Sequence, residues 1–313
     1  MSSKKNKIQP IDNSKPKMLI SFSGGRTSAF MTHWLLNNKP DEYDFIVVFA
    51  NTGKEREETL QFVHDCDTHF NFKTIWIEAV VNPEFRKGTT ARIVTFETAS
   101  RNGEPFEDVI KKYGIPNMSN PHCTRELKKY AIRNFAKSLG WKKYETAIGI
   151  RNDEIDRISS AKDVERLSYP LISMIPSTKQ DVWNFWSKQS FDLQLKGYEG
   201  NCDCCWKKSL RKLMTIAVET PEKFEWWNEM EEKYESYAPA SKPSMLRKIA
   251  DGELMRFNRR EMPVNEIIEL SKTEKFEMAT DDTKFENADE KQKTKGGIDL
   301  DLSNGCVESC EVF

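Results

Sequence analysis

The chain lacks the long apolar run that a membrane-spanning helix needs, and its polar, lysine-rich start lacks the pattern of a signal peptide. It also lacks an excess of either charge, because 48 Lys and Arg residues stand against 49 Asp and Glu residues. No global basic field therefore indicates a nucleic-acid ligand, although a local patch is compatible with this balance. We expect a soluble, cytoplasmic protein without a membrane partner.

Cysteine is too scarce and too unevenly spread for a disulfide scaffold. The chain has 7 cysteines among 313 residues, and three of them fall within the stretch "GNCDCCWKK". Disulfide-stabilised domains are usually smaller and more evenly studded. In a reducing compartment, this clustering favours metal or redox chemistry.

The first half of the chain alternates between strand and helix patterns. Residues 1–17 are polar, and we expect them to form a disordered arm. Apolar strand patterns and amphipathic helix patterns then follow one another. This alternation predicts an α/β fold with a mostly parallel sheet and helices on both faces. The expected strands are 18–22, 44–51, 73–79 and 144–150, and the expected helices are 28–38, 55–70 and 125–140.

The second half of the chain has a different character. Helical patterns at 179–191 and 207–235 predict a helical C-terminal extension, which we place at 191–272 together with its cysteines. Residues 273–313 are highly charged and poor in large aliphatic side chains, a composition typical of a flexible tail. Cys306 and Cys310 lie near the end of this tail.

A glycine turn stands between the first expected strand and its helix, in "LISFSGGRTSAF" from Leu19 to Phe30. Paired Gly24 and Gly25 let main-chain amides converge on an anion, and the following helix adds its positive end. The spacing fits neither the P-loop nor the dinucleotide-binding glycine pattern. An ordinary turn between a strand and a helix remains the alternative.

Five stretches resemble one known family in the same order. "SFSGGRTS" resembles the PP-loop of the adenine-nucleotide alpha-hydrolase superfamily. Four further stretches resemble segments of one branch of that superfamily, the phosphoadenosine phosphosulfate (PAPS) reductase-like family. They are "VVFANTGKEREETLQFV", "HCTRELKK", "IGIRNDEIDR" and "YPLISMIPSTKQDVWNFW". The resemblance implies a Rossmann-like (HUP/PP-loop) domain at 18–190 that binds ATP or PAPS. Thr27 and Asn51 depart from it, because the family usually has Asp at both positions.

The resemblance also implies a set of nucleotide-binding residues. Arg151 follows an expected strand, so we assign it to the substrate phosphate and to catalysis rather than to a structural ion pair. Arg125 and Lys128, three residues apart in an expected helix, could face phosphate or sulfate together, or form a solvated helix face. Thr52 also fits the N-cap of a helix. The set comprises Ser21, Ser23, Gly24, Gly25, Arg26, Thr27, Ser28, Asn51, Thr52, Gly53, Gly149, Arg125, Lys128 and Arg157.

The cysteines allow three interpretations. Cys202 and Cys205 have the spacing of half a metal site, which Cys123 and Cys310 would complete as a [4Fe–4S] cluster, with Cys306 as the substitute for Cys310. Structural zinc is the second interpretation, and reduced cysteines without metal are the third. The resemblance adds a catalytic role for Cys310, because family reductases carry a nucleophilic cysteine on a mobile tail. Cys123 is a further catalytic candidate.

Three functions follow from these features. The first is reduction of PAPS to sulfite, with thioredoxin or glutaredoxin regenerating the enzyme. The second is an ATP pyrophosphatase that adenylates a tRNA or DNA base, which a sulfur donor then thiolates. The third is a nucleotide sensor or scaffold that binds without turnover. The feature that favours it is Thr27, which stands where the family usually has Asp. A homo-oligomer is compatible with each of them.

Overall fold

A computed structural model describes residues 15–84, 86–118, 120–258, 262–281 and 283. Most of the predicted N-terminal arm and the end of the predicted tail, with Cys306 and Cys310, lie outside these residues. In the described ranges, no helix combines the length and the apolar character that crossing a bilayer requires.

Six strands form one sheet, and all neighbouring pairs are parallel except the last pair at one edge. The order across the sheet is β4-β3-β2-β1-β5-β6, and β4 runs antiparallel to β3. The predicted α/β fold with a mostly parallel sheet is confirmed. The strands are β1 (Lys17–Ser21), β2 (Asp44–Asn51), β3 (Ile75–Val80), β4 (Thr90–Val94), β5 (Glu145–Ala147) and β6 (Leu167–Ser168).

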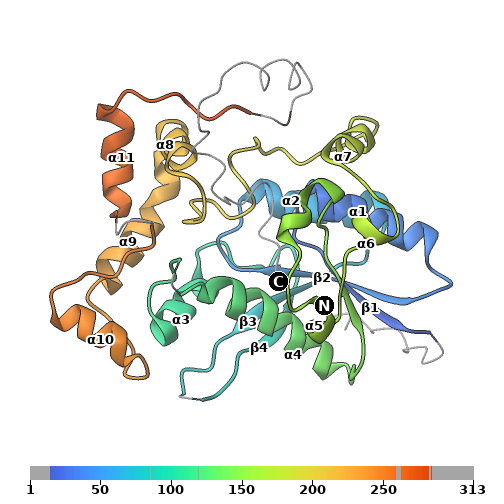
Figure 1. The fold of residues 1–313 in the computed structure, drawn as a ribbon, viewed down its shortest axis with the longest axis horizontal. Coiled ribbons are helices and arrows are strands. Elements are labelled where there is room, and N and C mark those ends of the chain that lie inside the picture. The colour runs from blue at the N-terminus through green and yellow to red at the C-terminus, as the bar shows by residue number, and fades with distance from the viewer. Residues whose placement is uncertain (1–14, 85, 119, 259–261, 282, 284–313) are drawn as a thin grey trace, which may run out of the picture.

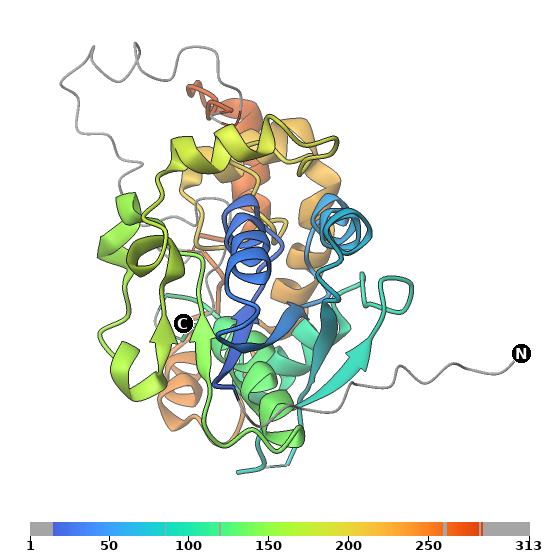
Figure 2. The same cartoon turned by 90° about the vertical axis from the view of Figure 1, so that its right-hand side faces the viewer.

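Helices cover both faces of this sheet (Figure 1). Helices α1 (Arg26–Asn38) and α2 (Glu57–Phe70) lie on one face, and α7 (Lys179–Trp186) packs outside α1 (Figure 2). Helices α3 (Glu104–Tyr113) and α4 (Ala131–Ser138) lie on the other face. Alternate strand residues point to opposite faces, so Ile20 joins the core under α1 while Leu19 joins the core under α4.

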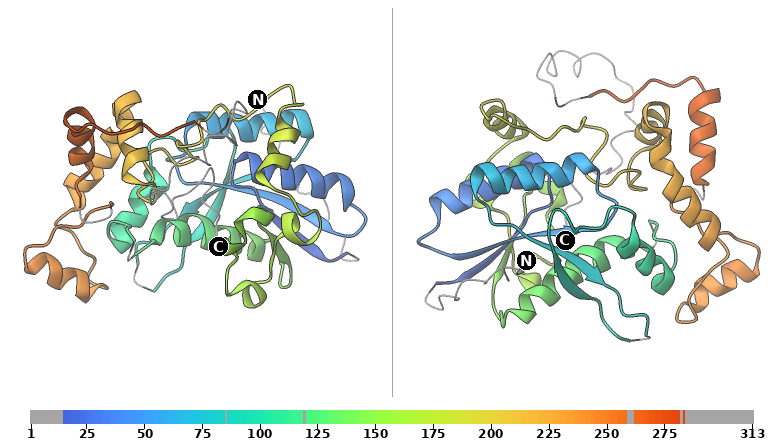
Figure 3. Two further views of the ribbon diagram at one scale, coloured as in Figure 1. Left: turned by 45° about the horizontal axis from the view of Figure 1, so that its top comes forward. Right: turned by 180° about the vertical axis from the view of Figure 1, so that it is seen from behind.

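The helical extension lies beside α3 at one end of the sheet (Figure 3). Trp227 and Leu213 of the extension belong to the same buried cluster as Val109 of α3 and Leu127. The extension therefore shares a hydrophobic core with the sheet and does not stand apart from it. Its elements are α8 (Leu210–Glu219), the 3₁₀ turn η3 (Pro221–Phe224), α9 (Glu225–Tyr234), α10 (Pro243–Ala250) and α11 (Val264–Thr273).

The helix expected at 125–140 is divided in two. Its first part is a π-helix, η1 (Thr124–Tyr130), and its second part is α4, followed by Gly140 in a left-handed conformation with φ of 77°. A π-helix is wound more widely than an α-helix and often occurs at functional sites. The short elements η2 (Asn152–Arg157), α5 (Lys162–Glu165) and α6 (Pro170–Ser173) follow β5 along the chain.

Candidate nucleotide site and thiol cavity

The turn between β1 and α1 can be built only with glycine at its centre. Gly24 has a φ of 81°, and Gly25 is the N-cap of α1 in an extended conformation. A Cβ atom on Gly24 would lie 2.6 Å from Cγ2 of Thr59 on α2. Both the backbone conformation and the contact with α2 therefore exclude a side chain at this position.

The main-chain amides of this turn belong to buried residues and have no acceptor among the residues that the structure describes. The amide of Ala29 donates to the carbonyl oxygen of Gly25 at 3.0 Å, but within the described chain no acceptor is found for the amides of residues 24–28. Ser28 is fully buried, and Thr27 is only 4% exposed. Buried amides without a partner are rare in proteins. At a helix N-terminus, they form a site for an anion.

Side chains of the same turn hold its shape. The hydroxyl groups of Ser23 and Ser28 are 2.9 Å apart, and the Ser28 hydroxyl donates to the Gly25 carbonyl oxygen at 3.0 Å. The Arg26 guanidinium donates to both carboxylate oxygens of Asp192, at 2.7 and 3.0 Å. The charge of Arg26 is thus directed to Asp192, and what this residue offers to an anion is its main-chain amide. Ser21 lies within β1, paired with β2.

Arg151 reaches the first turn of α1 from the loop after β5. Its Nη1 donates to Oγ1 of Thr27 at 3.1 Å, and its Nε donates to Oδ1 of Asp153 at 2.9 Å. A Cβ atom on Gly149 would lie 2.9 Å from Cα of Ser28, so the two backbones are in contact here. The loop that carries Arg151 therefore packs directly against the first turn of α1. Glu154 pairs with both arginines of this loop, with Arg157 and, at 3.4 Å, with Nη1 of Arg151. Arg151 thus also takes part in a structural ion pair, the alternative to its assignment to the substrate phosphate.

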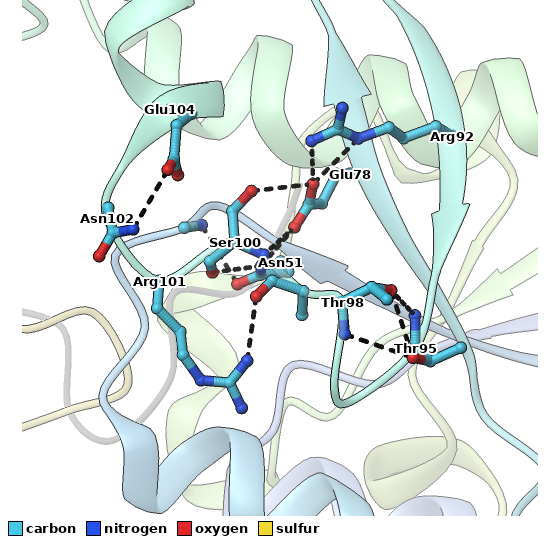
Figure 4. A network of polar contacts seen from close by, with 11 residues as sticks. Asn51, Glu78, Arg92, Thr95, Thr98, Ser100, Arg101, Asn102 and Glu104 are labelled. Carbon is cyan, nitrogen blue, oxygen red and sulfur yellow. Dashed lines mark hydrogen bonds and ion pairs between the residues drawn. The ribbon is translucent and has the colours of Figure 1, made fainter.

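Asn51 ends β2 and binds a buried carboxylate on β3 (Figure 4). Its Nδ2 donates to Oε1 of Glu78 at 2.7 Å and to the Ser100 carbonyl oxygen at 2.8 Å, while its Oδ1 accepts from the Gly53 amide at 3.1 Å. Glu78 is fully buried and also accepts from Arg92 at 2.7 Å. Aspartate at position 51 would place two carboxylates against each other, which explains the amide in this chain.

Thr52 does not cap a helix, contrary to one of the two sequence interpretations. Helix α2 begins at Glu57 with Arg56 as its N-cap. The Glu55 carboxylate instead accepts from the Thr52 amide at 2.9 Å and from the Thr52 hydroxyl. Its other oxygen lies 3.4 Å from Nζ of Lys128.

Arg125 and Lys128 do not share a helix face, because η1 is a π-helix. Lys128 is buried beside Glu55, whereas the Arg125 side chain is 40% exposed and donates to Glu126 at 2.8 Å. The two cations therefore point to different places. Of this pair, Lys128 is the one that lies near Thr52 and the end of β2.

The cysteine loop, residues 200–208, is hydrogen-bonded directly to the glycine turn and to the segment that follows β2. Nδ2 of Asn201 donates to the Ser23 carbonyl oxygen at 2.8 Å, and the Arg56 amide donates to the Asn201 carbonyl oxygen at 2.7 Å. The Asp203 amide donates to the Lys54 carbonyl oxygen at 3.1 Å. Sequence reasoning missed Asn201, and its only signal was its position next to Cys202.

Three of the predicted ligand cysteines line one small cavity. Cys123, Cys202 and Cys205 surround a volume of about 20 Å³ together with Glu55 and Lys128. The hydrogen bond with Cys205 and then burial raise the pKa of the Cys202 thiol. Cys204 points elsewhere, because its thiol donates to the Lys223 carbonyl oxygen at 3.4 Å. The structure thus brings Cys123, Cys202 and Cys205 to one place, and their role as metal ligands stays a prediction.

The described residues do not form a metal site by themselves. Among them, no group of three or more His, Cys, Asp or Glu side chains is arranged to hold a metal ion. Cys310 and its substitute Cys306 lie outside the described residues. The [4Fe–4S] cluster and zinc thus stay predictions.

Comparison with known proteins agrees with the order of these motifs. The family model of the phosphoadenosine phosphosulfate reductase domain matches residues 17–194. An uncharacterized nin region protein of Escherichia phage lambda is 32% identical over 200 residues, which cover 62% of this chain and 67% of the phage protein. An uncharacterized protein of Methanocaldococcus jannaschii is 25% identical over 229 residues, covering 70% of this chain and 42% of that protein. The chain belongs to the phosphoadenosine phosphosulfate reductase domain family.

Proposed function

We propose that the chain binds an adenine nucleotide at the turn before α1 and reduces a sulfonucleotide such as PAPS to sulfite. The observation that carries this proposal is the row of main-chain amides at residues 24–28, which are buried and have no acceptor in the described ranges of the chain. Phosphate oxygens are the acceptors that such amides bind best at a helix N-terminus. The family match supports the same ligand class.

In this proposal, each part of the site has a separate task. The amides of residues 24–28 bind phosphate oxygens, and the Arg151 guanidinium neutralises charge beside Thr27. Asn51 and Gly53 shape the loop at the end of β2 where the nucleotide lies. Because the amides belong to the main chain, the absence of Asp at position 27 does not remove the anion site.

A second candidate is an ATP pyrophosphatase that adenylates a tRNA or DNA base for thiolation. The thiol cavity favours it, because the cysteine loop is bonded to the phosphate-binding turn through Asn201 and Ser23. A sulfur atom carried on one of these thiols would lie near the nucleotide. In this candidate the external partner is a sulfur donor, whereas in the first it is a thioredoxin or glutaredoxin.

A product assay separates these candidates. Purified chain is incubated with PAPS or with ATP, and binding, sulfite and pyrophosphate are each measured. Sulfite from PAPS supports reduction, and pyrophosphate from ATP supports adenylation. Binding of either nucleotide without a product would support the sensor. Absence of binding to both nucleotides would refute the anion site itself.

A further inference from the structure

The helices η1 and α4 carry a local excess of positive charge that the balanced charge of the whole chain conceals. Residues 124–143 contain seven Lys and Arg residues and one acidic residue, Glu126, which is only 1% exposed. Helix α2, on the other face of the sheet, contains four acidic residues and no Lys or Arg (Figure 1). The helices η1 and α4 on one face and α2 on the other thus have opposite charge.

Six of the seven cations are partly or fully exposed and follow one another along this layer. Lys129 and Arg133 lie together, because both pair with the carboxylate of Glu165. Lys137 follows Arg133 by four residues within α4, so the two share a helix face. The chain then turns, since the Gly140 amide donates to the Lys137 carbonyl oxygen at 3.0 Å. We call the following six residues the basic row: Arg125, Lys129, Arg133, Lys137, Lys142 and Lys143.

The length of the basic row and the ring beside it fit a phosphodiester backbone. A helix rises about 1.5 Å per residue, so residues 125–137 span about 18 Å. One strand of a duplex advances about 3.4 Å per phosphate, so this length faces about five phosphates. Tyr130 is 40% exposed in the same stretch, and the Arg125 guanidinium lies 6.0 Å from the centre of its ring. Aromatic rings among cations are typical of surfaces on which unpaired bases stack.

A membrane fits the basic row less well. A helix that lies on a membrane exposes large apolar side chains beside its cations, and these side chains enter the lipid. In the stretch 124–143, all of which the structure describes, Tyr130 is the one large hydrophobic residue that is exposed. The basic row therefore offers charge and one ring, and it offers no apolar face.

We propose that the basic row binds the sugar–phosphate backbone of a nucleic acid without reading its base sequence. Its cations pair with phosphate oxygens, and binding releases the counterions of those phosphates. One end of the row lies beside the cysteine loop, because Nζ of Lys207 donates to the hydroxyl of Thr124, the first residue of η1, at 3.1 Å. This proposal goes beyond sulfonucleotide reduction and does not depend on it, and it would give the second candidate function its nucleic-acid substrate.

The salt dependence of binding tests the basic row. The full chain is titrated into two labelled probes, a duplex DNA of about 20 base pairs and a single-stranded RNA of about 20 nucleotides, from about 50 to about 200 mM salt. We expect the logarithm of the association constant to fall linearly with the logarithm of the salt concentration. The triple variant Lys137→Gln, Lys142→Gln, Lys143→Gln should weaken binding of both probes by about 10- to 100-fold and reduce the slope for the duplex by about three.

A second triple variant is the matched control. Lys188→Gln, Lys248→Gln, Lys272→Gln removes the same charge from exposed positions outside the basic row. It should bind both probes as the unmodified chain does, because the phosphate contacts remain.

Other outcomes overturn the proposal in distinguishable ways. No binding of either probe at the lowest salt concentration, or equal losses in the two triple variants, would exclude the basic row as a nucleic-acid surface. Displacement of both probes by poly-L-glutamate at an equal concentration of charge would assign the row to an acidic protein partner instead. Calorimetric titration with ATP and PAPS should give the same result for the first triple variant and the unmodified chain, so failure of this proposal leaves the nucleotide site untouched.

Discussion

The glycine turn proposed to bind phosphate and the thiol cavity are neighbours, but they are built in opposite ways. In the turn, the main chain offers the unpaired groups, and side chains such as Ser28 and Arg26 are occupied in holding the shape. In the cavity, side chains form the lining, and its polar members include the thiols of Cys123, Cys202 and Cys205 and the Glu55 carboxylate. A site made of amides tolerates changes of side chain, whereas a site made of thiols and a carboxylate does not.

The largest effect should come from adding a side chain to the turn. Gly24→Ala combines a left-handed backbone with a Cβ contact of 2.6 Å to Thr59. We expect loss of nucleotide binding and a loss of about 2–4 kcal/mol in the free energy of unfolding. Gly140→Ala is the matched control, because Gly140 has a φ of 77° and no atom near its Cβ position. Calorimetric titration and denaturant unfolding of both variants measure the difference. Retained nucleotide affinity in Gly24→Ala would contradict the main-chain site.

The next effect should come from placing a carboxylate beside Glu78. Asn51→Asp sets two acceptors against each other in a buried position, so stability should fall by about 2 kcal/mol and nucleotide affinity should fall with it. Adding Glu78→Gln returns a donor between the strands, so the double variant should recover part of both losses. Denaturant unfolding measures the loss of unfolding free energy in each single variant and in the double variant. If the two single losses simply add in the double variant, the Glu78 carboxylate is not the cause of the loss in Asn51→Asp.

A smaller effect is expected from the Arg151 guanidinium, which donates to the Thr27 hydroxyl in the first turn of α1. Arg151→Gln should weaken nucleotide binding by about 10- to 100-fold, because one charged contact is removed while the amides remain. Arg133→Gln, on α4 and paired with Glu165, should leave the affinity unchanged. Equal nucleotide affinities of the two variants, measured by calorimetric titration, would show that Arg151 only braces Thr27.

The smallest effect concerns pH and the residue next to Cys123. Burial, followed by the nearby Arg125 charge, lowers the pKa of His122 from 6.5 to about 4. The unfolded chain therefore binds the proton more readily, and stability should fall as the pH drops from 6.5 towards 4. His122→Gln should reduce this slope in urea unfolding at several pH values. An unchanged slope would mean that another group causes the acid sensitivity.

The sequence predicted those parts of the fold that local patterns encode. The strand at 44–51 and the helix at 28–38 match β2 and most of α1, because a buried apolar run and a 3.6-residue period are local signals. Strand β4 was missed, because its residues are largely exposed and show no clean alternation. The π-helix was also missed, since the sequence 125–140 has the apolar spacing of an ordinary helix.

The position of candidate residues along the chain could be predicted where the family motifs contain them. The partners of these residues could not be predicted where contacts between distant parts of the chain decide them. The glycine turn and Arg151 follow from their place after a strand. In contrast, the partner of Arg26 is 166 residues away at Asp192, and the partner of Asn51 is Glu78 on the next strand. Only the tertiary structure shows that Asn51 donates to a carboxylate and that Asn201 reaches Ser23.

The bond between Asn201 and Ser23 has a practical consequence for protein engineering. The family model ends at residue 194, so a fragment trimmed to that boundary would lose Asn201 and leave the Ser23 carbonyl oxygen without this donor. It would also uncover apolar side chains of α3 that the extension now shields from water. Expression of residues 17–194 alone should therefore yield an aggregation-prone polypeptide. A fragment meant to fold should end beyond α11.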